Sequence, residues 1–376
     1  MQKIVVRIVV ILVGMYGLFT VGRILTQFHL FDFAIYYQAV MDLKRGLSMY
    51  LDPTIAMKYP MSGMLVLYPI GWLPYAIVEK LWTLWSLTCL GLSLWWMGKL
   101  VPRLSKFDWV LIGCGIILSF PYKFTLGMGQ INLQILALLT GALYFYQRGR
   151  EGVAGTMLAI AAWIKITPLL LLLYFWRKRA YKTIVATIGV YILGWILAGA
   201  LWGFDLVSYF WREVVPSISM TGNFVYYNQG LTGILARSGV VDTAAQIINY
   251  LVLSVMMILS YWVTPINRVG DADEMIAYGL FVACMLIGAG LAWQHYFVWT
   301  IYLFIGIWAK LKTRDKQVKY MTVVLLVSYA LVAMNVKNPQ DFSGFVQLIL
   351  SHMTVGTLLL WGLGVRLMTA KELQGS

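Results

Sequence analysis

The chain has 376 residues, of which 61% are hydrophobic and 12% charged, and its mean hydropathy is +0.77. Soluble domains are about half apolar and a quarter charged, so these values predict an integral membrane protein without room for a soluble catalytic domain. The formal net charge is +14. Its lysines and arginines do not gather in a solvated domain, which argues against a nucleic-acid partner.

The apolar runs predict an all-α polytopic bundle of about 12 transmembrane segments, some short or broken, in a single domain over residues 1–376. The first run follows Lys3 and Arg7 but is longer than the apolar part of a signal peptide, so we expect an uncleaved first helix. The runs fall at 4–25, 78–98, 107–120, 131–147, 152–176, 183–202, 247–264, 275–292, 296–309, 320–334 and 352–369.

The run 152–176 decides the topology, because it contains Lys165 followed by Thr167 and Pro168. As one span it would put the basic loop 177–182 (RKRAYK) outside, against the positive-inside rule. A break at Lys165–Pro168 returns the chain to the cytoplasmic side. That side then holds 19 of the 29 basic residues and seven of the 15 acids, or +12 of the net charge.

Three long segments then face outward, at 26–77, 203–246 and 335–351. Function concentrates in loops held by a rigid scaffold, so we expect the active surface on the extracytoplasmic side of the plasma (inner) membrane, facing the periplasm. The sequence has no Walker lysine motif, no nucleotide-binding GxGxxG and no HExxH, which argues against ATP, dinucleotides and zinc proteolysis.

Asp32 follows the first run almost at once, and the residues after it predict an amphipathic helix on the outer interface that stops at Gly46. The carboxylate has two interpretations, as the N-cap of this helix or as a site residue, and one residue can be both. The apolar positions at helical spacing are Phe33, Tyr36, Tyr37, Val40 and Leu47.

The stretch Lys58–Pro74 (KYPMSGMLVLYPIGWLP) contains three prolines and predicts a pair of short re-entrant or interfacial helices. Further along, polar residues stand in apolar surroundings. A buried lysine needs a partner or water, so Lys165 favours a functional role, whereas single amides more often join helices. His295 is either an interfacial histidine or a site residue. The amides are Gln130, Asn132, Asn228 and Gln229.

Together these segments resemble glycosyltransferase family 87, membrane transferases with the GT-C architecture that use polyprenyl-phosphate sugars. The resemblance covers most of residues 1–310 and includes one departure, Gly230, where the family often has serine after NQ. The motifs, in order, are DFAIYYQAVMDLKRGLSMY, KYPMSGMLVLYPIGWLP, GQINLQILALL, AGTMLAIAAWIKITPLLLLLYFW, NQGLTGILAR and WQHYFVW.

The resemblance implies a lipid-phosphate sugar donor, with mannose favoured, bound at the outer leaflet. It also implies a single aspartate base, and Asp32 stands where that base belongs. His295 is the second catalytic candidate. The donor already carries a phosphate leaving group, so the acceptor hydroxyl needs the base, and in-line attack inverts the anomeric centre. Fixed positive charge stabilises the departing phosphate. The candidates for this role are Lys165, Arg212, Arg237, Lys58 and His295, and those for cavity polar groups are Tyr59, Gln130, Asn132, Asn228 and Gln229.

The nearest acid after Asp32 is Asp42, on another helix face, so the paired acids that a hard cation prefers are not expected. We therefore predict no metal and no cofactor, with the lipid-linked sugar as a substrate and a glycolipid or glycan as the acceptor. A multi-pass lipid or solute transporter or flippase, with a broken-helix site around Lys165, is the alternative. A non-enzymatic scaffold is a third class, but it does not explain Lys165.

Overall fold

The computed structural model describes residues 2–27, 29–50, 57–219, 226–312, 318–337, 339 and 344–369. Within these ranges the regular elements are all helices, and the only pairing of β type is an isolated bridge between Asn228 and Trp293. The predicted all-α class is confirmed for this part of the chain.

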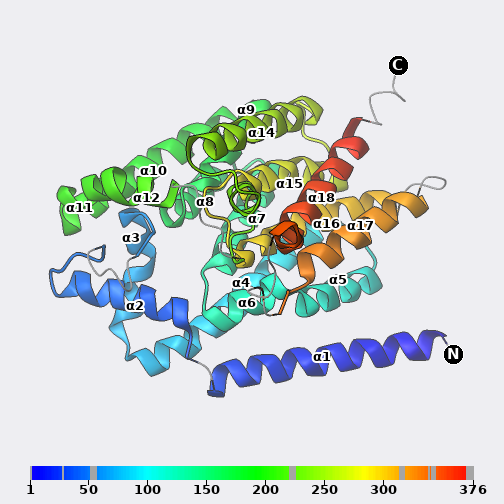
Figure 1. The fold of residues 1–376 in the computed structure, drawn as a ribbon, viewed down its shortest axis with the longest axis horizontal. Helices are drawn as coiled ribbons and strands as arrows, with labels where there is room; N and C mark the ends of the chain where they lie inside the picture. Colours follow the sequence, from blue (N-terminus) through cyan, green and yellow to red (C-terminus); the bar gives the residue numbers. More distant parts are fainter. Residues whose placement is uncertain are drawn as a thin grey trace.

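The helices differ widely in length, and several are single turns (Figure 1). Their bounds are α1 (Gln2–Gln27), α2 (Phe31–Lys44), η1 (Met61–Gly63), α3 (Met64–Leu67), η2 (Tyr68–Trp72), α4 (Tyr75–Leu100), α5 (Lys106–Leu118), α6 (Phe120–Met128), α7 (Asn132–Gln147), α8 (Glu151–Ile164), η3 (Thr167–Leu171), α9 (Leu172–Arg177), α10 (Tyr181–Trp202), α11 (Phe204–Tyr209), η4 (Phe210–Val214), α12 (Val215–Ser219), α13 (Leu231–Arg237), α14 (Asp242–Val263), α15 (Asp271–Ile287), η5 (Gln294–Thr300), α16 (Ile301–Leu311), α17 (Val318–Ala333), η7 (Gly344–Ser351) and α18 (His352–Thr369).

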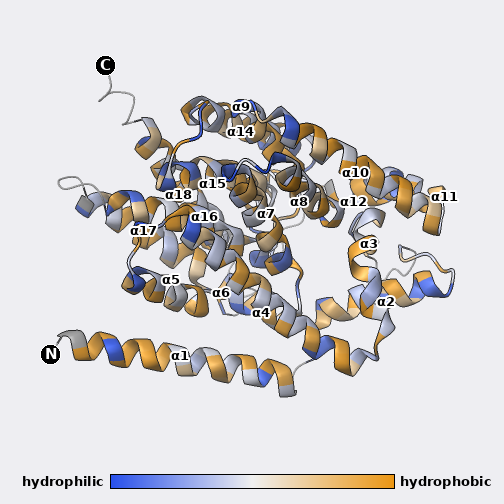
Figure 2. Cartoon of the chain, turned by 180° about the vertical axis from the view of Figure 1, so that it is seen from behind, coloured by the Kyte–Doolittle hydropathy of each residue, from blue (hydrophilic) through white to orange (hydrophobic). Residues whose placement is uncertain are grey.

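By length and composition, four of the described helices can cross a bilayer, or five if the pair α5 and α6, bent by 59°, counts as one span. The predicted number of about 12 transmembrane segments stays a prediction, since the other apolar helices are short or interrupted. The long helix α1 lies apart from the body and touches α5 (Figure 1). Its exposed side chains are mostly apolar (Figure 2), as expected for a surface that faces lipid.

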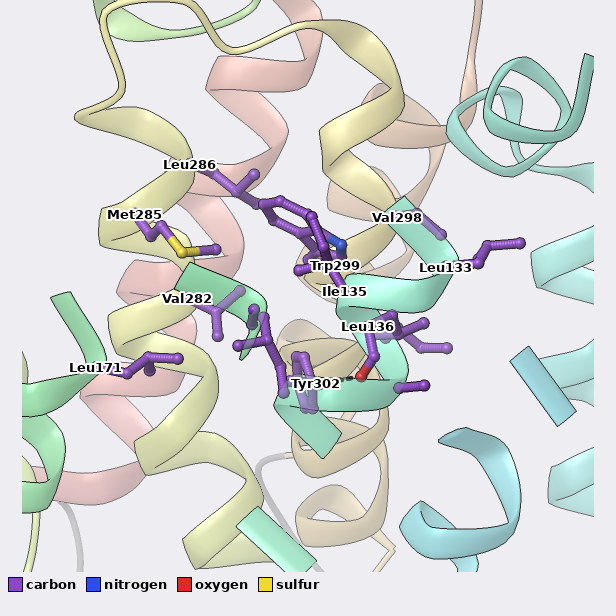
Figure 3. Packing of buried hydrophobic residues seen from close by; sticks show 14 of the residues in the cluster. Leu133, Ile135, Leu136, Leu171, Val282, Met285, Leu286, Val298, Trp299 and Tyr302 are labelled. Carbon is purple, nitrogen blue, oxygen red and sulfur yellow. Dashed lines mark hydrogen bonds between the residues drawn. The ribbon is translucent and has the colours of Figure 1, made fainter. Parts of the chain in front are cut away.

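The core of the bundle is built from α7, α15 and α16 with the irregular turns η3 and η5 between them. Figure 3 shows Leu136 of α7 facing Tyr302 of α16, whose hydroxyl donates to the Leu136 carbonyl at 3.2 Å. Around this centre α8 packs between α7 and α10, and α18 covers α15. A close-packed centre of this kind gives the irregular segments beside it a rigid support.

The predicted break in the run 152–176 is present. Helix α8 ends at Ile164, Lys165 has an extended backbone, and η3 and α9 carry the chain back. The end of α9 lies near the start of α8, because Lys178 bonds to the Asn267 carbonyl at 2.9 Å and Arg268 pairs with Glu151 at 2.9 Å. The segment therefore turns back instead of crossing once.

Five ion pairs gather at this end of the bundle, and every one joins two segments that the charge pattern assigns to the same side. Which face of the membrane this end meets stays a prediction. The pairs are Arg103–Asp271 (2.7 Å), Lys178–Glu274 (2.8 Å), Arg268–Glu151 (2.9 Å), Lys310–Asp273 (2.5 Å) and Lys312–Asp108 (3.1 Å). In Figure 1 the helices α2, α3 and α11 lie at the opposite end.

Candidate active site

A cavity of about 740 Å³ lies at the end of the bundle where α2 and the break at Lys165 meet. Its walls come from α2, residues 57–60, the end of α6, the break, the η4–α12 region and residues 289–296. Six of the eleven predicted site residues line it, although they are spread over most of the chain. They are Asp32, Lys58, Tyr59, Gln130, Lys165 and His295.

Asp32 lies in the first turn of α2, and its side chain faces the cavity. The N-cap position belongs to Leu30, whose amide donates to the buried carboxylate of Glu79 at 2.6 Å. The N-cap interpretation of Asp32 is therefore wrong, because Glu79 from α4 supplies the acceptor at this helix end. Asp32 instead accepts a hydrogen bond of 2.5 Å from Gln130 Nε2.

Helix α2 presents the face that the sequence predicts. Phe33, Tyr36 and Val40 are buried and Tyr37 is half-buried, but Leu47 is exposed and lies beyond the helix end at Lys44. Gly46 follows this end with a φ of +72°, a conformation that glycine adopts without strain. The predicted stop is thus confirmed.

Gly129 brings the GQIN turn (residues 129–132) against the start of α2. Its φ is +72°, and a Cβ there would lie 2.7 Å from the Cβ atoms of both Leu30 and Phe33. Its carbonyl also accepts from Trp82 Nε1 at 2.8 Å. A residue with a side chain would be strained at this φ and would push α2 away, so glycine here sets the distance between Gln130 and Asp32.

The side-chain amide of Gln130 is held by two tyrosines. Tyr36 and Tyr59 donate to Gln130 Oε1 at 2.9 and 3.2 Å, and their hydroxyls lie 2.9 Å apart. Because Oε1 accepts from both, Nε2 is directed to Asp32. Sequence reasoning missed Tyr36, although it stands four positions after Asp32 and so shares its helix face.

Lys165 sits at the point where α8 stops and is 7% exposed. Its Nζ donates to Asn132 Oδ1 at 2.8 Å and lies 3.4 Å from the ring centroid of Tyr296. The rings of Tyr59 and Trp299 are 5.3 and 5.4 Å away. Aromatic faces stabilise an ammonium without neutralising it, so these rings favour the charged form of Lys165 beside the cavity.

His295 is buried and lines the cavity, yet neither of its ring nitrogens has a hydrogen-bond partner among the described residues. Its backbone carbonyl is held by Asn132 Nδ2 at 3.2 Å and by Thr125 Oγ1 at 3.1 Å. A buried imidazole without a partner is costly, and a hydroxyl or phosphate in the cavity can satisfy it.

The remaining predicted residues do not line the cavity, and a role for them in the site stays a prediction. Arg212 is exposed on η4, where nothing directs it to the site. Arg237 is buried and donates to Ser351 Oγ at 2.9 and 3.0 Å and to the Asn228 carbonyl at 3.0 Å. Asn132 stands behind Lys165 and reaches the cavity only through it.

Asn228 and Gln229 fasten the wall of the cavity instead of facing it. Asn228 Oδ1 accepts from the backbone N–H groups of Gly230 and Ala292 at 3.2 and 3.1 Å. The backbone N–H of Gln229 donates to the Ala292 carbonyl at 2.7 Å. A Cβ at Gly230 would lie 3.0 Å from the Ala289 carbonyl oxygen. The glycine that departs from the familiar motif therefore allows the segment 289–292 to approach closely.

Comparison with known proteins identifies the family of this chain. The family model of glycosyltransferase family 87 matches residues 58–293, more than half of the chain. The chain belongs to glycosyltransferase family 87. Asp32 and His295 flank the matched range, and the other four predicted site residues that line the cavity lie within it.

Curated relatives of this family member are mycobacterial. A polyprenol-phosphate-mannose-dependent alpha-(1-2)-phosphatidylinositol mannoside mannosyltransferase of Mycolicibacterium smegmatis is 24% identical over 264 residues, 65% of this chain and 59% of the relative. A pentamannoside mannosyltransferase of the same kind from that organism is 24% identical over 263 residues, 66% of this chain and 60% of the relative. The chain thus spans about 60% of the length of these relatives. No solved structure matches it.

Proposed function

We propose that this protein transfers mannose from a polyprenyl-phosphate donor to a hydroxyl of a glycolipid or glycan acceptor, at the extracytoplasmic face of the plasma membrane. The observation that carries the proposal is one cavity that holds a carboxylate, Asp32, and a buried lysine, Lys165, which pairs with no acid in the described part of the chain. Family membership and the names of the relatives support the donor class.

The chemistry needs a base and a cation. The acceptor oxygen bonds to the anomeric carbon from the side opposite the phosphate, the bond from this carbon to the phosphate oxygen breaks, and the hydroxyl proton passes to Asp32. The configuration inverts. Lys165 stabilises the negative charge that the leaving phosphate keeps, while Lys58 adds charge at the exposed rim and His295 hydrogen-bonds a sugar or phosphate oxygen.

Replacing Asp32 by asparagine tests the base directly. We expect Asp32→Asn to lower the rate of mannose transfer from radiolabelled polyprenyl-phosphate mannose by about 10³-fold, because the amide cannot take the proton. The matched control is Asp42→Asn on the same helix, whose carboxylate accepts from Gln38 at 2.7 Å and does not line the cavity. This control should retain the wild-type rate.

Two results would contradict the proposal. Transfer at the wild-type rate by Asp32→Asn removes the base assignment. If purified wild-type protein in liposomes moves labelled donor lipid between leaflets without breaking its phosphate–sugar bond, the transporter alternative takes its place.

The orientation is tested separately with an impermeant thiol reagent on intact cells. Single cysteines at Lys58 and Arg179, both exposed and at opposite ends of the bundle, serve as reporters. We expect position 58 to react from outside and position 179 to react only after permeabilisation. The reverse pattern would place the cavity on the cytoplasmic side.

A further inference from the structure

The two opposite charges of the cavity are each tied to an amide of the same short turn. Gln130 donates to Asp32 at 2.5 Å, and Asn132 accepts from Lys165 at 2.8 Å. No ion pair joins Asp32 and Lys165 in the part of the chain that the structure describes, since the carboxylate is bonded to Gln130 and the ammonium to Asn132. The GQIN turn (residues 129–132) therefore binds the base and the cation through two different side-chain amides.

Each amide is held in one orientation by a second contact. Tyr36 and Tyr59 donate to Gln130 Oε1, which leaves only the donor nitrogen for Asp32. Asn132 Nδ2 donates to the His295 carbonyl at 3.2 Å, which leaves only the oxygen for Lys165. A half-turn of the amide would break three hydrogen bonds at Gln130 and two at Asn132, so the direction of both is fixed.

A carboxylate and an ammonium in an apolar cavity attract each other strongly, because little water screens them. A direct pair would weaken both groups: a cation in contact lowers the pKa of a carboxyl group by about one to three units, and a paired lysine has less charge to offer a phosphate. Keeping the groups apart preserves the basicity of one and the charge of the other.

We propose that the GQIN turn is a spacer, in which Gln130 and Asn132 are positioning residues that prevent Asp32 and Lys165 from forming an ion pair. Its purpose rests on the proposed transfer reaction, but the separation itself can be measured without a substrate. This role differs from substrate binding, because the two amides act on the protein's own charges whether or not a substrate is bound.

The measurement follows the protonation of Asp32 by infrared spectroscopy. The carboxyl C=O band of Asp32 is isolated as the difference between each protein and its Asp32→Asn version, and its titration midpoint is recorded in detergent. The ionisable groups that face Asp32 from the surrounding elements are Tyr36, Lys58, Tyr59, Lys165, His295 and Tyr296. Among these, only Lys165 bonds to Asn132 through its ionisable side chain, whereas His295 is held by Asn132 through its backbone carbonyl.

We expect Asn132→Leu to lower the midpoint by about one pH unit, because the released ammonium moves to the carboxylate. In the double variant Asn132→Leu with Lys165→Met the lowering should disappear, and the midpoint should equal that of Lys165→Met alone. Asn132→Ser, whose side chain is too short to hold Lys165 in place, provides a second variant if the leucine protein does not fold.

Asn249→Leu is the matched control, because Asn249 is an equally buried asparagine on α14 that donates to the Gly288 carbonyl at 3.1 Å, outside the cavity. It should leave the midpoint of Asp32 unchanged. The proposed spacer role is contradicted if the Asp32 carboxyl group of folded Asn132→Leu or Asn132→Ser has a titration midpoint equal to or above that of the wild type. A wild-type protein that transfers no sugar would instead overturn the proposed function and leave this measurement standing.

Discussion

Lys165 and Lys178 stand at the two ends of the segment that turns back after α8, and their surroundings differ sharply. Both are buried, with exposures of 7% and 6%. Lys178 pairs with Glu274 at 2.8 Å and donates to the Asn267 carbonyl, so its positive charge is balanced by an acid of the protein itself. Lys165 has an amide and three aromatic rings around it, but no acid in contact among the residues that the structure describes.

The difference separates a structural lysine from a site lysine. Burial lowers the pKa of Lys178, and the Glu274 carboxylate opposes that shift, which is the behaviour of a group kept charged by its partner. Lys165 has no such carboxylate in contact among the described residues, and its side chain lines the cavity. Burying a charge without a counter-ion destabilises a protein, so its position beside a cavity points to a counter-ion that arrives with a ligand.

Removing Lys165 gives the largest expected effect on transfer. Lys165→Met should lower kcat/KM for the donor by about 10²- to 10³-fold, because one preorganised cation at the leaving group is lost. Its stability in an SDS titration should equal or exceed that of the wild type, since methionine has no charge to bury. A marked loss of stability with normal transfer would make Lys165 a structural residue like Lys178.

Removing Lys178 should reverse this pattern. Lys178→Met leaves Glu274 buried and unpaired, so we expect the free energy of unfolding to fall by about 3–5 kcal/mol. The folded fraction should transfer mannose at a nearly normal rate. Lys178→Met combined with Glu274→Gln should recover much of the stability, because the glutamine carries no charge; no recovery would show that the pair is not the source of the loss.

Lys58 provides a third, exposed lysine at the rim of the same cavity. Water and salt screen exposed charges, so Lys58→Met should raise the KM for the donor by about threefold and leave kcat unchanged. The difference between wild type and variant should shrink as the salt concentration rises. An effect as large as that of Lys165→Met would mean that exposure does not decide the strength of these cations.

Local signals in the sequence were enough to predict the break and an irregular helical stretch within Lys58–Pro74, although the stretch is one contiguous run, Met61–Trp72, and not the predicted pair of helices. A lysine and a proline inside an apolar run, and three prolines within Lys58–Pro74, act on the backbone where they stand. The end of α2 before Gly46 follows from the same kind of local rule. The grouping of Asp32, Gln130, Lys165 and His295 in one cavity came from the family resemblance, because residue spacing alone does not bring such distant positions together.

Sequence reasoning is weakest for side chains whose partners are far away in the chain. Arg237 bonds to Ser351, and Gln229 bonds to the carbonyl of Leu350, contacts that span more than a hundred residues. A cation or an amide in an outer segment looks the same in the sequence whether it meets a ligand or fastens a loop. Asp32 shows the same limit, since the acceptor at the start of α2 comes from Glu79 on another helix.

A metal chelator gives the smallest expected effect. If Lys165 supplies the positive charge at the leaving phosphate, a divalent cation is not needed, and transfer in EDTA should equal transfer in magnesium or manganese. The described residues contain no group of three acid, histidine or cysteine side chains that could hold a metal ion, and Asp32 is the only acid that lines the cavity. Full loss of transfer in EDTA, restored by magnesium, would assign the phosphate charge to a metal and reduce Lys165 to a supporting role. An unchanged rate in EDTA, together with the loss in Lys165→Met, would assign that charge to the lysine itself.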